Sequence, residues 1–153
     1  MAKVDLFRSP RDGSFLFYNL DAAVGKGGAN RRDDVLLVQY LMRTSANVPG
    51  KFGATVGGID QVAGAWSDFD DQLLGIVQKY WSEHGTATWQ DRRVDPVPSQ
   101  QSASPIHHTQ YKIVTLNVIY KYVRPGDFPR MAEAADCPGE LRPLIRAPDW
   151  LKS

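Results

Sequence analysis

The chain has 153 residues, of which 42% are hydrophobic and 23% charged, the size and composition of one globular domain with its own core. A formal net charge of +1 gives no general attraction for polyanions, so nucleic-acid binding is not expected. The single cysteine excludes an internal disulfide framework. Since no apolar window is long enough to span a membrane and the first residues lack the apolar core of a signal peptide, we expect a chain made in the cytoplasm.

The first predicted element is a β-hairpin within residues 1–20. Apolar residues flank the segment SPRDG at positions 9–13, and its Pro, Asp and Gly favour a tight reversal of the chain. A two-stranded ribbon is only marginally stable alone, so this one must pack on the helices or pair with another chain. The favoured interpretation is that it covers the domain's own core, and an edge for a partner is the alternative.

A glycine-rich loop that leads into a capped helix is predicted between Val24 and Thr44. Asn30 is expected to cap the helix and Asp33 to reach back to it, which is a capping-box arrangement. Apolar residues then recur at helical spacing, namely Val35, Val38, Leu41 and Met42, with Leu37 beside them. The rest of the chain must therefore cover one face of this helix.

Two further helices are predicted after a long loop over residues 45–66. Ser67 is expected to cap the second, which ends near Gly85 and whose buried stripe would be Phe69, Leu73, Ile76, Val77 and Tyr80. Ser104 and Pro105 are expected to begin the third, which ends before Pro125. Because residues 111–122 are rich in β-branched side chains, a strand is the alternative there, but poor alternation and the length of the segment favour a helix.

The remaining residues, 126–153, combine prolines with short apolar patches. This pattern predicts one or two helical turns and an extended arm. The arm would lie over the domain's own surface or over a neighbouring chain, and both interpretations stay open.

No catalytic constellation emerges, so we expect neither enzymatic activity, nor a cofactor, nor a metal site. Cys137 has no histidine near it in the sequence, and the motif G-x-S-x-G is absent. Binding chemistry remains, because aromatic platforms beside convergent polar groups recognise saccharides and peptides. The candidates lie around the two loops between helices and are Trp66, Trp89, Asp91, Arg92 and Arg93. The alternative for the two tryptophans is that they plug the ends of a helical bundle.

The sequence G-x-G-G-x-N at 25–30, followed by D-D-V, V-Q and L-M, resembles the first helix of peptidoglycan-binding-like domains, whose pattern is roughly N-x-x-D-V-x-x-V-Q-x-L-L. The motif positions are Asn30, Asp33, Val35, Val38, Gln39 and Leu41. A weaker similarity covers residues 24–123. It includes DRRVDP at 91–96, which resembles the family's D-G-x-V-D-P turn with Arg92 in place of glycine.

The resemblance implies a mainly α-helical fold, a three-helix peptidoglycan-binding-like bundle, with the N-terminal β-hairpin and the extended C-terminal arm added. The expected parts are the hairpin at 1–20, the helical domain at 21–125 and the arm at 126–153. The function it implies is a non-catalytic module that binds cell-wall peptidoglycan and is accessory to a phage or a protein-delivery system.

The alternative is a structural or adaptor subunit of a larger assembly, a phage particle or a contractile machine, that docks through the hairpin and the tail. The expected partner is accordingly peptidoglycan or a protein assembly, and a homo-oligomer is open. Without a signal peptide, the protein would reach the wall in a virion or through a secretion or injection machine.

Overall fold

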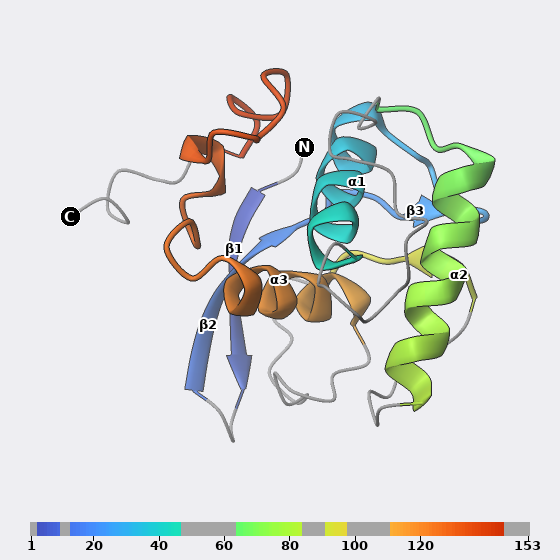
Figure 1. The fold of residues 1–153 in the computed structure, drawn as a ribbon, viewed down its shortest axis with the longest axis horizontal. Coiled ribbons are helices and arrows are strands. Elements are labelled where there is room, and N and C mark those ends of the chain that lie inside the picture. The colour runs from blue at the N-terminus through green and yellow to red at the C-terminus, as the bar shows by residue number, and fades with distance from the viewer. Residues whose placement is uncertain (1–2, 10–12, 47–63, 84–90, 98–110, 146–153) are drawn as a thin grey trace.

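The computed structural model describes residues 3–9, 13–46, 64–83, 91–97 and 111–145 (Figure 1). Its helices are α1 (Arg32–Ala46), α2 (Asp68–Glu83) and α3 (Lys112–Val123), followed by a short 3-10 turn, η2 (Met131–Glu133). Its strands form two small antiparallel sheets, β1 (Lys3–Ser9) with β2 (Gly13–Asn19) and β3 (Val24–Gly25) with β4 (Arg93–Val94). The fold is therefore mainly α-helical, as predicted. No helix in these ranges has the length and apolar character needed to cross a membrane.

The predicted hairpin is confirmed, with Ser9 paired to Gly13 and Val4 paired to Tyr18. Its turn, residues 10–12, lies outside the described residues. The outer edge of β2 is bonded by a side chain of α3, because the Asn117 amide oxygen accepts the Tyr18 N–H at 2.7 Å and the Asn117 amide nitrogen donates to the Tyr18 carbonyl at 3.0 Å. Asn117 thus takes the place of a third strand at this point. The hairpin covers the domain's own core, which was the favoured interpretation.

Helix α1 is buried around its whole circumference, since every residue from Asp34 to Thr44 is at most 2% exposed. The sequence required only one buried face. The other elements surround α1: α3 crosses it next to the hairpin, and α2 stands on the side away from the hairpin (Figure 1). The apolar motif positions Val35, Val38 and Leu41 all belong to this core.

The capping box predicted at α1 is wrong. Asn30 has a φ of 50°, and its side chain turns back into the glycine loop, where it accepts the Gly25 N–H at 2.7 Å and donates to the Gly25 and Gly28 carbonyls. The next acid, Asp34, accepts backbone N–H groups of the segment before the glycine loop, at Asp21 and Ala22.

A capping box does occur at α2. The Ser67 hydroxyl accepts the Asp70 N–H at 3.1 Å, and the Asp70 carboxylate accepts the Ser67 N–H at 2.9 Å. Ser67 is therefore the cap that the sequence predicted, and Asp70 completes it.

Two details of the later helices differ from the prediction. In the expected buried stripe of α2, Leu73 and Val77 are buried, but Phe69 is 37% and Ile76 is 50% exposed, and the Tyr80 side chain lies outside the description. The third segment is a helix, as favoured over a strand. It begins at Lys112 after the N-cap residue Tyr111, so Ser104 and Pro105 do not begin it.

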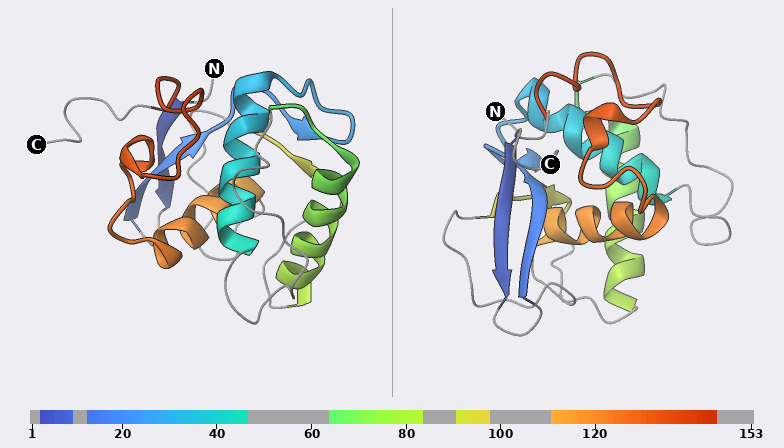
Figure 2. Two further views of the ribbon diagram at one scale, coloured as in Figure 1. Left: turned by 45° about the horizontal axis from the view of Figure 1, so that its top comes forward. Right: turned by 90° about the vertical axis from the view of Figure 1, so that its left-hand side faces the viewer.

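The C-terminal segment, residues 126–145, lies over the domain's own surface, which was one of the two open interpretations, and it contains the predicted helical turn, η2. It folds back in a series of turns, so the prediction of an extended arm is wrong for these residues. Its apolar side chains join the same core as the hairpin and α1, and they are Met131, Ala132, Ala134, Cys137, Leu141 and Ile145. The Tyr40 hydroxyl of α1 donates to Asp136 at 2.9 Å, and the Tyr18 hydroxyl donates to the Pro129 carbonyl. Figure 2 shows the segment lying over α1 and beside the hairpin. Residues 146–153 lie outside the description.

Candidate functional site

The short sheet of β3 and β4 brings two distant loops together. Lys26 donates its backbone N–H to the Arg92 carbonyl at 3.0 Å, next to the pairing of Gly25 with Arg93. Gly25 has a φ of 105°, and a Cβ added to it would lie 2.3 Å from the Arg92 carbonyl oxygen. Only glycine allows the two strands to come this close.

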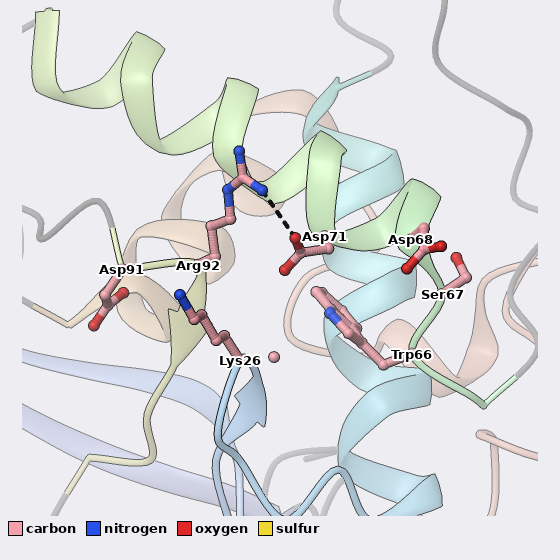
Figure 3. Close-up of a pocket in the computed structure, with 8 residues that line it drawn as sticks. Lys26, Trp66, Ser67, Asp68, Asp71, Asp91 and Arg92 are labelled. Carbon is pink, nitrogen blue, oxygen red and sulfur yellow. Dashed lines mark hydrogen bonds and ion pairs between the residues drawn. The ribbon is translucent and has the colours of Figure 1, made fainter.

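A pocket of about 470 Å³ lies between this sheet and the start of α2 (Figure 3). We call it the Trp66 pocket. It is lined by Gly25 and Lys26, by residues 66–68 and Asp71 at the start of α2, and by residues 91–92. Three of the five residues predicted to bind a ligand, Trp66, Asp91 and Arg92, thus line one pocket although they come from different loops.

The other two predicted residues do not line the described part of this pocket. Arg93 directs its guanidinium to Asp95, with Nε at 3.0 Å from the carboxylate, and both side chains are 43% exposed. Trp89 lies outside the described residues. The pair Arg92 and Arg93 therefore divides into one residue in the pocket and one beside it.

Trp66 lies between the core and the pocket. Its ring packs against the hydrophobic core, and it also forms part of the pocket wall. Its indole Nε1 is buried and has no hydrogen-bond partner within the part of the chain that the structure describes. The loop that carries it is held by Gln39 of α1, which accepts the Gly64 N–H at 2.9 Å and donates to the Ala65 carbonyl at 3.0 Å. The motif residue Gln39 is therefore a positioning residue for Trp66.

Arg92 adopts a backbone conformation that normally belongs to glycine. Its φ is 56°, and its N–H donates to the Gln78 side-chain oxygen at 3.0 Å. The guanidinium crosses α2 to pair with Asp71 at 3.0 Å (Figure 3). It passes over Gly75, where an added Cβ would lie 3.0 Å from the Arg92 Nε. The glycine in the middle of α2 leaves room for this side chain.

Asp91 is fixed as an anion. Partial burial opposes its ionisation, but the Lys112 ammonium at 2.7 Å and the Arg93 N–H at 3.1 Å outweigh this effect, so the pKa of Asp91 is lowered. Lys112 is itself only 4% exposed, which makes Asp91 the counter-ion of a buried cation. Its second role, as a wall of the Trp66 pocket, uses a carboxylate that is already oriented.

Sequence reasoning missed Lys26, Asp68 and Asp71 as lining residues. Acidic residues in the first turn of a helix are explained by the helix dipole alone, and a lysine in a glycine-rich loop does not by itself indicate a binding site. The signal that identifies them is spatial, because the pairing of β3 with β4 brings Lys26 next to Arg92 and Arg92 reaches Asp71.

The described part of this site offers non-covalent recognition. It combines an indole surface, ammonium and guanidinium groups and carboxylates around one open pocket. Among the described residues, no group of three or more His, Cys, Asp or Glu side chains is arranged to hold a metal ion.

Comparisons of the chain with family models, with curated proteins and with solved structures give no match.

Proposed function

We propose that the chain is a non-catalytic module that binds cell-wall peptidoglycan through the Trp66 pocket, and that its three helices form a peptidoglycan-binding-like bundle. The observation that carries the proposal is that Trp66, Asp91 and Arg92, selected for binding chemistry, line one pocket. Further support comes from the motif glutamine Gln39, which holds the loop of Trp66, and from Gln78, which holds the backbone of Arg92.

The chemistry of the pocket suits this polymer. Peptidoglycan presents apolar sugar faces, amides, carboxylates and ammonium groups, and the pocket presents an indole with charges of both signs. A module of this kind would reach the wall in a virion or through a secretion or injection machine, which is the accessory role that the resemblance implies.

The test is co-sedimentation with purified peptidoglycan sacculi. Arg92→Gly removes the guanidinium from the pocket and leaves a residue that accepts the observed φ, so the fold is retained. We expect this variant to bind sacculi with an affinity about tenfold lower than that of the wild type, because one charge-assisted hydrogen bond is lost. The matched control is Arg93→Ala, whose side chain pairs with Asp95 outside the pocket lining and whose binding is expected to stay unchanged. A wild-type protein that stays in the supernatant would refute the proposal.

A second function, an adaptor subunit that docks through the hairpin, is favoured by the edge of β1. The Tyr18 backbone N–H and C=O point away from β1, so Tyr18 and Val4 form a non-hydrogen-bonded pair of the ladder. The N–H and C=O groups of Val4, and those of Arg8 four residues later, therefore point away from β2, towards the outer edge. In the described residues no strand pairs with that edge. The described part of the tail, residues 126–145, packs on the domain's own core and gives the docking role of the tail no such support.

Light scattering tests the adaptor proposal. If the β1 edge joins subunits, the protein has the mass of an oligomer, and Arg8→Pro yields monomers because it removes a donor from the outer edge and none from the β1–β2 ladder. A wild-type monomer would exclude assembly of this chain with itself.

A further inference from the structure

A second hollow lies on the other side of Arg92, with a volume of about 480 Å³. We call it the α2 hollow. It is lined by Gln72, Gly75, Ile76, Gln78, Lys79 and Arg92. Arg92 also lines the Trp66 pocket, so the two hollows adjoin at this side chain.

One exposed face of α2 runs along both hollows. Asp68, Gln72, Ile76 and Lys79 are spaced by four, four and three residues, which places them on one side of the helix, and all four are exposed. From Asp68 to Lys79 this face is about 16 Å long. An extended peptide of about five residues has the same length.

The two ends of this face differ in charge. Among the described lining residues, the α2 hollow contains the cations Lys79 and Arg92, the latter paired with Asp71, and no carboxylate. Lys79 has no ion-pair partner within the described ranges of the chain. The Trp66 pocket also contains a cation, Lys26, but it has three aspartates: Asp68 and the two that pair with Arg92 and Lys112.

Gln78 lines the α2 hollow and carries a buried side-chain amide. The residue is fully buried, and its side-chain oxygen accepts the Arg92 N–H, which fixes the orientation of the amide. The amide nitrogen Nε2 has no hydrogen-bond partner among the described residues. Beside it, Ile76 offers an apolar side chain that is 50% exposed. Donors next to a small apolar surface are complementary to a carboxylate that carries a short aliphatic side chain.

We propose that the α2 hollow binds the free carboxylate end of a short peptide whose last residue has a small aliphatic side chain. An ammonium-bearing residue nearer the start of that peptide extends past Arg92 towards Asp68. This inference rests on the proposed function and deepens it, because it assigns recognition of peptidoglycan to the peptide stem. A neutral glycan would make no use of the charge difference between the two hollows.

The test is a ¹⁵N NMR titration of the full chain with three probes: acetyl-Lys-D-Ala-D-Ala as the free acid, the same peptide as its C-terminal amide, and chitotetraose. The free acid is expected to shift the Gln78 side-chain amide and the Gly75 backbone amide, and the C-terminal amide to bind about tenfold more weakly. Equal affinity for acid and amide, or shifts at these two residues with chitotetraose alone, would overturn the inference.

Lys79→Gln provides the matched variant. It is expected to weaken binding of the free acid about tenfold and to leave the affinity for the C-terminal amide unchanged. Lys121→Gln, at an exposed lysine of α3, is the control and is expected to change neither affinity. An unchanged affinity of the free acid for Lys79→Gln would remove the carboxylate from the α2 hollow.

Parallel sedimentation with sacculi separates this inference from the proposed function. Sacculi that bind while neither peptide does would overturn the peptide site and leave the proposed function standing. A free-acid peptide that binds while intact sacculi do not would do the reverse. Failure of both experiments would overturn both proposals.

Discussion

At the scale of single residues, Arg92 combines two requirements that normally exclude each other. Its backbone has the positive φ of a glycine, which strains a residue with a Cβ by about 1–2 kcal/mol. Its side chain, which a glycine would lack, reaches Asp71 and separates the Trp66 pocket from the α2 hollow. Strain of this kind persists only where the surrounding structure holds it, and it agrees with the binding role proposed for Arg92.

Asp91 gives a pH-dependent prediction. Because its pKa in the folded protein is below the ordinary value of 3.8, the stability it contributes is present above that value and is lost as the pH falls through the folded pKa. Asp91→Asn leaves the buried Lys112 without its anion, and we expect the free energy of unfolding at pH 7 to fall by about 1–2 kcal/mol. Urea unfolding should show this difference at pH 7 and a smaller one at pH 2.5. A difference that grows on acidification would contradict the assignment.

At the scale of elements, the loop before α1 is held by an amide that acts on the loop and not on the helix. The Asn30 nitrogen donates to the Gly25 and Gly28 carbonyls, and its oxygen accepts the Gly25 N–H. The loop that carries Lys26 therefore depends on both ends of the Asn30 amide.

Asn30→Asp distinguishes this arrangement from a helix cap. Aspartate caps helices as well as asparagine does, so a capping role predicts no loss of stability. A carboxylate has no N–H to donate, so we expect a fall of about 1–2 kcal/mol in the free energy of unfolding, measured with urea. Ser67→Ala, at the true cap of α2, should lose about 1 kcal/mol and serves as the reference. If Asn30→Asp is as stable as the wild type, the residue would act as a helix cap and not through its amide N–H groups.

The local elements were predictable and the long-range contacts were not. The hairpin turn, the Ser67 cap and the apolar period of α1 depend on residues a few positions apart, so the sequence contains them directly. The target of the Asn30 amide could not be deduced, since loop and helix offer the same donors and acceptors. In the resembled pattern the acid directly precedes the valine, and here that residue is Asp34, which holds the preceding segment.

The candidate site was predictable only in part. Trp66, Asp91 and Arg92 were found because an indole and charged groups in loops are typical of binding surfaces. Lys26 and Asp71 join them through the pairing of β3 with β4, two strands of two residues each that carry no recognisable pattern.

At the scale of the whole molecule, the C-terminal segment at 126–145 closes the core over α1. Its links to α1 include the Tyr40 hydroxyl on Asp136 and the Arg32 guanidinium on Glu140. Cys137, in the same segment, is 3% exposed, and burial raises the pKa of its thiol to about 11. The thiol can therefore report whether the segment is closed.

Thiol labelling of Cys137 at pH 8 measures that closure. The wild-type protein should react slowly, and Tyr40→Phe should react about tenfold faster because it loses the hydrogen bonds of the Tyr40 hydroxyl. Tyr122→Phe changes a tyrosine that is 80% exposed and should leave the rate unchanged. If Tyr40→Phe reacts at the wild-type rate, the segment opens without breaking its contact with α1.

The bond between Asn117 and the hairpin also sets an order for synthesis on the ribosome. Tyr18 is translated 99 residues before the asparagine that covers its strand edge. Until then the ribbon has only two strands, which are marginal in water, and its apolar face has neither α3 nor Met131 to pack against. The hairpin therefore becomes stable only after most of the domain has been translated, and in that interval its exposed edges are a natural substrate for chaperones.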